Sequence, residues 1–288
     1  MTTYLRLLPE QLPEIAEWIA NLNKQNTHHI GFCGTDASAL LNDFQEDFIQ
    51  DELTTLVGQF EQDQLVGLIG FDCDDETAEV WGPFHLNHSV SDSVALWQFA
   101  RNEFSELQTF LFFLHAENTA QQQVMSEIHA DFRGKHLYYV RPRDGFDSSR
   151  DSLTYVFQDA DQEALLKMHS TEFPDTYYDT QTLINRSTSP DHLLLMAKLD
   201  GASVGYAYVE KAPDEHSAHL EYLAIAPAFR GQGLGYRWLS AVLAEVFTDE
   251  RVQHVTLTVS TDNEAANPLY EKVGFQKENE LWFYKLGQ

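Results

Sequence analysis

The chain has 288 residues, which is about two domains' length at roughly 150 residues per domain. Its 43% hydrophobic and 12% aromatic content is typical of folded globular proteins. With 45 acidic and 18 basic side chains the formal net charge is -27, which argues against a nucleic-acid partner because such a field repels phosphate backbones. The charge indicates either an acidic surface alone or a preference for a cationic ligand.

The sequence contains no targeting or membrane signal that we recognise. No stretch approaches the roughly 18 consecutive apolar residues of a membrane span, and the N-terminus lacks the regions of a signal peptide. We therefore expect a cytoplasmic protein with no membrane partner. Cys33 and Cys73 form no CxxC motif, and the pair His28 and His29 lacks a third ligand at a suitable spacing, so we expect free, packed thiols and no metal site.

The first half of the chain begins with a strand-like run at residues 4–8, followed by two amphipathic helices and three strands. Apolar residues define the inner faces of these helices: Leu12, Ile15, Ile19 and Leu22 in the first, and Leu40, Leu41, Phe44, Phe48 and Ile49 in the second. A further helix, strand, helix and strand complete this half. Residues 141–152 then form a polar segment with Pro and Gly, which is typical of a linker.

The second half repeats the first. Residues 255–286 match residues 110–141 at one constant offset, which places Asn263 on Asn118 and Tyr284 on Tyr139. The segment 201–209 likewise matches 63–71, each with Val-Gly inside a strand. The order of elements predicts two copies of one mixed α/β fold. We place the boundary between residues 145 and 146, giving domains 1–145 and 146–288.

Residues 224–239, AIAPAFRGQGLGYRWL, contain three glycines between an apolar strand and an apolar helix. Glycines before a helix let a phosphate approach the unpaired N–H groups of the first turn. A dinucleotide-binding fingerprint would need glycine at Tyr236, and no Gly-Lys-Ser/Thr follows for a P-loop. Taken alone, the glycines leave a phosphate cradle and an ordinary strand-to-helix turn equally open.

Two sequence motifs, which occur one after the other, favour the phosphate cradle over the ordinary turn. The pattern Q/R-x-x-G-x-G is met by Arg230, Gly233 and Gly235. The later pattern N-x-x-A-x-x-L-Y-x-K-x-G-F is met by Asn263, Ala266, Leu269, Tyr270, Lys272, Gly274 and Phe275. Together they resemble the GNAT superfamily of acyl-CoA-dependent N-acetyltransferases over most of residues 153–288, and the paired copies resemble tandem GNAT proteins such as mycothiol synthase. The resemblance implies a twisted, mostly antiparallel sheet in each domain, with helices on both faces and a splayed central strand pair.

The resemblance also implies acetyl-CoA as co-substrate, with its pantetheine arm lying in the gap beside the splayed strand. Three sets of residues would hold the cofactor. The strand would contribute Leu223, Ala224 and Ile225. The pyrophosphate would rest on Arg230, Gly231, Gln232, Gly233, Leu234 and Gly235. Asn263 and Asn267 would contact the pantetheine and cap the next helix, although turn and N-cap chemistry alone also explains both asparagines.

Acyl transfer to an amine needs a base for the amine proton and an acid for the departing thiolate. Tyr270 falls on the family's general-acid position, whereas an isolated Tyr on a short helix is more often a packing residue. His219 and Glu221 alternate on the strand before the pantetheine segment and so share one sheet face. Either could be the base, and each could equally be a surface residue beside the cleft. The backbone N–H near Ile225 would polarise the thioester carbonyl.

The first copy lacks these features. Asp92 stands where phosphate would rest, the later glycines are absent, and Met125 lies at the Tyr270 position. We expect this copy not to bind CoA productively. It would instead form one wall of the acceptor site, or pair with the second copy as an intramolecular pseudo-dimer within a monomer.

The acceptor is the least determined part of the prediction. Residues 168–179 include Phe173, Tyr177 and Tyr178 beside Asp175 and Asp179, which could hold a cationic amine, although a packed loop explains them better. We expect an N-acetyltransferase acting on a small amine such as a polyamine, an aminoglycoside-like or an amino-acid-like compound. A non-catalytic CoA sensor and a protein or peptide N-acetyltransferase remain the alternatives.

Overall fold

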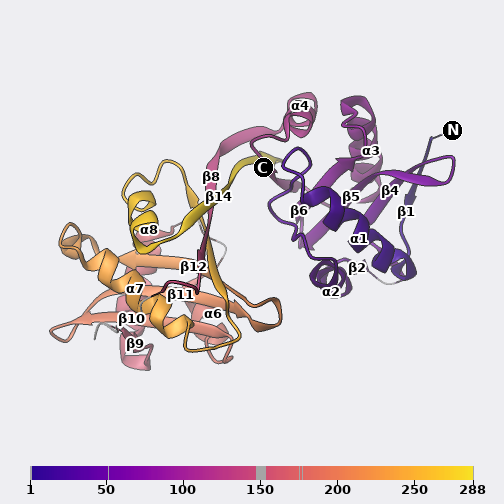
Figure 1. Ribbon diagram of the computed structural model, residues 1–288. Helices are drawn as coiled ribbons and strands as arrows, with labels where there is room; N and C mark the ends of the chain where they lie inside the picture. The colour runs from indigo at the N-terminus through magenta and orange to yellow at the C-terminus, as the bar shows by residue number, and fades with distance from the viewer. Residues whose placement is uncertain (1, 51, 147–153, 175, 177, 288) are drawn as a thin grey trace. The chain divides into compact units, whose positions relative to one another are not determined.

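The computed structural model describes residues 2–50, 52–146, 154–174, 176 and 178–287 (Figure 1). The chain divides into two compact units. The first unit comprises Met1–His136 and Asn279–Gln288, and the second unit comprises Leu137–Glu278. None of the helices formed by the described residues is long and apolar enough to cross a membrane.

The described residues of the first unit form four α-helices, and its main sheet runs in the order β1-β4-β5-β6-β7-β14, with β8 beyond β14. The elements before β8 are β1 (Thr2–Arg6), α1 (Leu12–Asn23), α2 (Ala37–Asp47), the short pair β2 (Ile49–Gln50) and β3 (Leu53–Thr54), β4 (Leu56–Glu61), β5 (Gln64–Asp74), β6 (Thr77–His85), α3 (Val90–Glu103), β7 (Thr109–His115) and α4 (Thr119–Glu127). β8 (Asp131–Pro142) begins in this unit and ends in the second.

The second unit has a sheet in the order β8-β13-β12-β11-β10-β9. Its elements are β9 (Thr154–Val156), α5 (Gln162–Glu172), α6 (Thr180–Arg186), β10 (His192–Leu199), β11 (Ala202–Ala212), β12 (Ser217–Ile225), α7 (Leu234–Val246), β13 (His254–Ser260), α8 (Asn267–Val273) and β14 (Gln276–Leu286), the last of which ends in the first unit. Short 3-10 turns precede α1, α5, β12 and α7. The order strand, helix, helix, three strands, helix, strand, helix, strand recurs in both copies, which confirms the predicted tandem α/β fold.

The last strands of the two copies are exchanged between the units. β14 pairs antiparallel with β7, from Leu281 opposite His115 to Leu286 opposite Phe110, and so completes the first unit. The end of β8 belongs to the second unit in return. The compact units therefore differ from a division at residue 145 in two segments, 137–145 and 279–288. β8 and β14 are related copies, as Tyr139 and Tyr284 indicate, and sequence alone cannot tell which of two similar strands completes which sheet.

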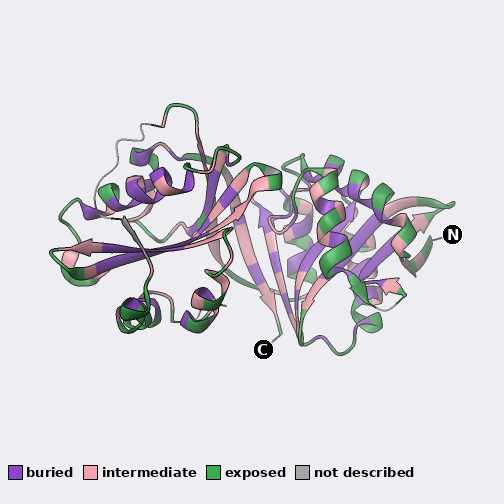
Figure 2. Ribbon diagram, turned by 90° about the horizontal axis from the view of Figure 1, so that it is seen from below, coloured by how far each residue is buried: buried purple, intermediate pink, exposed green. Residues whose placement is uncertain are grey.

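The second unit buries a separate core on each face of its sheet, because successive strand residues point to opposite faces. On β11, Ala207 and Val209 pack with α7, whereas Tyr206 and Tyr208 pack with α5 and α6; all four are fully buried. Figure 2 shows the buried residues on the inner sides of the helices and along the central strands of each unit. Helices on both faces leave only the ends and edges of this sheet for a binding site.

The start of the predicted linker is structured. Arg141 and Pro142 end β8, and the guanidinium of Arg143 donates to the carbonyl oxygens of Val252 (2.7 Å, from Nε) and Phe247 (2.8 Å, from Nη1). These arginines satisfy backbone carbonyls in the second unit, which is why a polar sequence here does not indicate a flexible connection. The rest of the predicted linker, residues 147–153, lies outside the described residues.

Candidate active site

The central strands of the second unit separate after a short stretch of pairing. β12 and β13 are parallel and pair only from Ser217 opposite His254 to His219 opposite Thr256. Beyond that point β12 continues to Ile225 and β13 to Ser260, with no further pairing between them among the described residues. The result is a V-shaped gap with its apex at His219 and Thr256, as the splayed strand pair of the family requires.

A β-bulge directs β12 along this gap. In the pairing of β12 with β11, Tyr222 lies opposite Tyr208 and Leu220 opposite Val209, so Glu221 is an extra residue without a counterpart. The bulge inverts the alternation of the strand. Leu220 therefore packs with α7, whereas Tyr222, two residues later, packs with α5 and α6 on the other face.

The backbone of β12 beyond the bulge offers hydrogen-bonding groups to the gap. The N–H of Ala226 donates to Val204 O at 2.8 Å, so alternate residues of β12, including Ala224, bond to β11. The N–H and C=O groups of Leu223 and Ile225 therefore point away from β11, toward the gap. Of the three strand residues assigned to the cofactor, Ala224 is the one whose backbone is used within the sheet.

The N-terminus of α7 faces no side-chain cap. Gly233 is the N-cap residue with φ of 76°, and among the described residues no side-chain cap hydrogen bond is found there. Gly231 has φ of 74°, and a Cβ atom at either glycine would meet open space. Gly235 has a different environment, because a Cβ there would lie 3.2 Å from Leu269 Cδ2 on α8, so that this leucine would have to shift. Two glycines thus leave the helix N-terminus accessible, in a form that could hold an anion, and the third lies at the contact between α7 and α8.

Arg230 is engaged by the protein itself. Its guanidinium forms an ion pair with Glu172 at the end of α5, and its Nε donates to Ile225 O at 2.9 Å. The charge that the sequence assigned to a phosphate is therefore balanced by a carboxylate, and the arginine ties the cradle to the strand. Gln232 donates to Ala228 O at 3.3 Å and so closes the preceding turn.

The two asparagines before and within α8 behave differently. Asn263 is exposed and its Oδ1 accepts from Ala266 N–H at 3.2 Å, which is the turn chemistry that the sequence allowed. Asn267 donates weakly to Thr261 O at 3.4 Å, but its Oδ1 is buried without a hydrogen-bond partner among the described residues. A buried acceptor without a partner is costly, so Asn267 is the asparagine that a donor group of a ligand would satisfy.

Tyr270 lies on α8 with 8% of its surface exposed. Its ring packs on Tyr139 and Phe275, with centroids 6.0 and 5.7 Å away, and no hydrogen bond to its hydroxyl is found among the described residues. Burial, with a smaller effect of Tyr139, raises the pKa of Tyr270 to about 12. The phenol therefore keeps its proton at neutral pH and has no internal acceptor, as a proton donor to a ligand should.

His219 and Glu221, the two candidate bases, lie close together: His219 Nε2 is 3.9 Å from Glu221 Oε1. His219 Nδ1 lies 2.7 Å from Thr256 Oγ1, and the Thr256 hydroxyl donates in turn to Ala218 O at 3.4 Å. When the Thr256 hydroxyl donates to Ala218 O, it accepts from His219 Nδ1–H. The neutral imidazole then has its lone pair on Nε2, on the Glu221 side.

A polar pocket of about 520 Å³, the histidine pocket, opens at the apex of the gap. It is lined by residues from β8, α6 and the four strands β10 to β13: Tyr138, Arg186, His192, Glu210, Lys211, Ala212, Ser217, His219, His254 and Thr256. Since His219 and Thr256 also form the last strand pair before the gap, the pocket and the gap meet at His219, one of the two candidate bases.

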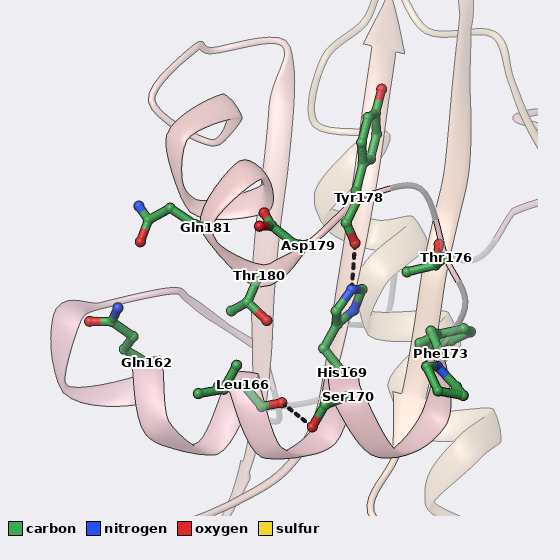
Figure 3. A pocket seen from close by; sticks show the side chains of 11 residues that line it. Gln162, Leu166, His169, Ser170, Phe173, Thr176, Tyr178, Asp179, Thr180 and Gln181 are labelled. Atoms are coloured by element: carbon green, nitrogen blue, oxygen red, sulfur yellow. Dashed lines mark hydrogen bonds between the residues drawn. The ribbon is translucent and has the colours of Figure 1, made fainter. Parts of the chain in front are cut away.

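A second pocket, of about 390 Å³, lies between α5, α6 and their connection (Figure 3). His169 is 3% exposed here and bonds with Tyr206 OH (2.6 Å) and Tyr178 O (2.7 Å). Asp179 caps α6 by accepting from Thr182 N–H at 2.7 Å. Phe173 stacks edge-on against Tyr222 at 4.9 Å. These contacts favour the packed-loop interpretation of this segment; Asp175 and Tyr177 lie outside the described residues.

In the first unit the equivalent gap is filled by the chain. β6 and β7 pair only from Thr77 opposite Thr109 to Glu79 opposite Leu111. Beyond this, His115 N–H donates to His29 O (3.1 Å) and Gly31 N–H to Phe113 O (2.6 Å), so residues 29–31 lie along β7. β14 pairs with the other edge of β7. Residues 29–31 therefore pair with the part of the β7 edge that lies beyond its pairing with β6.

Further contacts hold the first unit in this closed form. The buried Asn23 accepts from Ile30 N–H at 2.7 Å and donates to Cys33 O at 2.8 Å. Asp92 and Ser89 bond reciprocally at the start of α3, with Ser89 Oγ 2.6 Å from Asp92 Oδ2, so the helix N-terminus already has its carboxylate. Both observations support the expectation that this copy does not bind CoA.

Comparisons with known proteins agree with this geometry. The sequence profile of the Acetyltransferase (GNAT) family matches residues 156–275. The N-alpha-acetyltransferase RimI of Mycobacterium tuberculosis is 32% identical over 122 residues, which cover 41% of this chain and 70% of that protein. The chain therefore belongs to the GNAT family, and the protein is an acetyltransferase.

Solved structures show the same fold over the whole chain. A GCN5-related N-acetyltransferase from Sphaerobacter thermophilus has a TM-score of 0.76 with 16% identity, and the match covers 99% of this chain and 95% of that one. A tandem GNAT protein from the clavulanic acid biosynthesis pathway has a TM-score of 0.66 with 15% identity, covering 100% and 98% of the two chains. These likenesses confirm the tandem arrangement of two GNAT folds.

Sequence reasoning missed several residues around the site. Tyr139, which packs on Tyr270 and donates to Glu271 Oε1 at 3.2 Å, comes from β8 and therefore from the sequence of the first copy. The sequence motifs also did not identify Thr256, His192 and Glu210. A side chain on an alternating strand carries no motif, and only the pairing register identifies these residues as neighbours of His219.

Proposed function

We propose that this protein transfers the acetyl group of acetyl-CoA to a primary amine of a small molecule, by direct attack within a ternary complex. The open gap between β12 and β13 is the observation that carries the proposal. It runs from the uncapped N-terminus of α7 to the apex where His219 and Thr256 meet the histidine pocket. A thioester can enter from one side and an amine from the other.

The residues present fit acetyl-CoA. The amides from Gly231 to Gly235 would hold the pyrophosphate, since helix N-termini favour anions. The backbone groups of Leu223 and Ile225 that point to the gap would pair with the pantetheine amides, and the partnerless Asn267 Oδ1 would accept from one of them. When bound, the cofactor supplies an activated acetyl group with a thiolate as leaving group.

Two proton transfers complete the reaction, and the chain has a group for each. His219 Nε2 or Glu221 accepts the proton of the attacking amine, directly or through water. Tyr270 gives its hydroxyl proton to the departing sulfur, a role that its raised pKa suits because the phenol is protonated when transfer occurs. A backbone N–H of the splayed strand, near Ile225, stabilises the charge on the carbonyl oxygen.

A peptide N-terminus is the second candidate acceptor, because a relative of 32% identity is an N-alpha-acetyltransferase. The acidic surface of this chain is compatible with either acceptor. A CoA sensor without activity is less well supported, since a sensor needs no proton donor beside the sulfur.

The test of the proposal is Tyr270→Phe, which removes one hydroxyl from a side chain that forms no hydrogen bond among the described residues. We expect kcat to fall by about 100-fold, with acetyl-CoA affinity unchanged, because the loss affects only proton donation. CoA release with a panel of amines and calorimetric binding of acetyl-CoA measure the two quantities. Phe275→Leu, next to Tyr270 in the core, serves as a packing control. Unchanged turnover in Tyr270→Phe would remove the tyrosine from the mechanism.

A further inference from the structure

The histidine pocket restricts the class of amine that the enzyme can accept. This inference rests on the proposed function, since it takes the pocket as the acceptor side of the same active site. The pocket is within the size range of small-molecule sites, roughly 300–1,000 Å³. Its lining combines charged, imidazole and hydroxyl side chains, and Ala212 is its one aliphatic member among the described residues.

The charges of the pocket are balanced in pairs. Arg186 Nη2 lies 2.9 Å from Glu210 Oε1, and Arg186 Nε is 3.1 Å from the same oxygen. Lys211 Nζ lies 3.4 Å from Asp249 Oδ2, with 11% and 15% of these side chains exposed. Asp249 also pairs with Arg251 at 2.8 Å, so two cations share this carboxylate. Arg186 and Glu210 neutralise each other, and neither is an uncompensated charge for a ligand.

Hydrogen bonds leave an acceptor nitrogen on two of the three pocket histidines, His192 and His219. Tyr208 OH donates to Glu210 Oε1 at 3.0 Å, so it accepts from His192 Nδ1–H, 2.8 Å away, and His192 Nε2 keeps a lone pair. Thr256 fixes His219 in the same way. Among the described residues, no hydrogen bond uses Glu210 Oε2. The pocket thus presents two imidazole nitrogens and one carboxylate oxygen that accept protons, a set that suits hydroxyl groups.

We propose that the acceptor is a small monoamine that carries several hydroxyl groups, of the amino-sugar or amino-alcohol kind. Its hydroxyls donate to His192 Nε2 and Glu210 Oε2 and accept from the outer guanidinium nitrogens of Arg186. Its amine lies at the apex of the gap beside His219 and Glu221. A polyamine would place a second positive charge beside the balanced Arg186, and an amino acid would place its carboxylate beside Glu210.

Acceptor competition in the wild-type enzyme tests this class. Glucosamine, spermidine, glutamate and a dipeptide are compared at equal concentration by CoA release, and their binding to Tyr270→Phe is measured by calorimetry in the presence of CoA. We expect glucosamine to give the highest kcat/KM, by about tenfold or more, and the tightest binding. Preference for any of the other three would overturn the proposed class while leaving the transferase activity intact. Absence of acetyl-CoA binding would instead defeat the proposed function.

Two charge variants test the role of the ion pair. Arg186→Met leaves Glu210 without its counter-charge and should shift preference toward spermidine, whereas Glu210→Gln leaves Arg186 unbalanced and should shift preference toward glutamate. Glu163→Gln makes the same charge change on the exposed first turn of α5 and should leave the order of acceptors unchanged. Equal loss of all acceptors in both pocket variants, with acetyl-CoA binding retained, would show that the pair supports the fold rather than selecting the acceptor.

Discussion

Thr256 is a buried residue, 6% exposed, that determines which nitrogen of His219 carries the proton. It lies at the last pair of β12 and β13, opposite His219 itself. Its hydroxyl accepts from His219 Nδ1 and donates to Ala218 O, so Nε2 is the nitrogen left to take a proton. In the proposed mechanism Thr256 is thus a positioning residue, which acts on the reaction only through His219.

The corresponding prediction concerns Thr256→Val, which keeps the shape of the side chain and removes its hydroxyl. We expect kcat to fall about tenfold, the acidic limb of the pH–rate profile to move, and KM for acetyl-CoA to stay constant, because only the orientation and tautomer of the base change. Thr256→Ser should restore the rate.

A double-mutant cycle separates this role from a structural one. In a His219→Asn background the Thr256→Val change should have no further effect on kcat, since the group that it orients is gone. If Thr256→Val lowers kcat by the same factor in both backgrounds, the threonine acts on the fold and Glu221 is the better candidate for the base.

The sequence predicted some of these residues and could not predict others. Tyr270, Gly233 and Asn263 were found because they belong to a motif with fixed spacing. The proximity of His219 to Glu221 followed from strand alternation, although a bulge at Glu221 also contributes to it. Tyr139 and Thr256 depend on which strands are neighbours, which is information that no local pattern contains.

At the scale of elements, α7 shows how one helix N-terminus can be kept open for an anion. Gly233 takes the N-cap position where Ser, Thr, Asp or Asn would normally satisfy the first N–H groups. In the first copy, Ser89 and Asp92 supply that cap at the start of α3. The difference between an open and a capped helix start therefore distinguishes the two copies.

Gly233→Asp and Gly233→Asn test this element as a matched pair. Both residues tolerate the positive φ of 76° better than other side chains do, and both can cap the helix, but only Asp adds a negative charge. We expect Asp to weaken acetyl-CoA binding by about tenfold more than Asn, as measured by calorimetry, because the carboxylate competes with the pyrophosphate. Equal affinities in the two variants would mean that the pyrophosphate does not rest on this helix.

The sequence predicted the order of elements in both copies, because amphipathic periods and the internal repeat are strong signals. It did not assign separate roles to the three glycines, since packing of Gly235 against Leu269 depends on the angle between α7 and α8. Residues 29–31 gave no strand signal, because their pairing with β7 is stabilised by the side chain of Asn23 and not by a local pattern.

At the scale of the whole molecule, one fold occurs twice, and the two copies differ in whether the gap beside the splayed strand is occupied by the chain. In the second unit the gap beside the splayed strand is open to a ligand, and in the first unit residues 29–31 occupy it. The exchange of β8 and β14 means that the first copy contributes Tyr139 to the surroundings of Tyr270. The strand exchange therefore places a residue of the first copy's sequence beside the proposed general acid, which the sequence alone did not predict.

The central claim is that the chain carries a single acetyl-CoA site, formed by the second unit. Calorimetric titration of acetyl-CoA into the intact protein tests it most directly, because stoichiometry and affinity come from one experiment. The account predicts one site per chain, weakened in Gly233→Asp. Two sites would contradict the closure of the first unit by residues 29–31, and no binding would contradict the acetyl-CoA cleft itself.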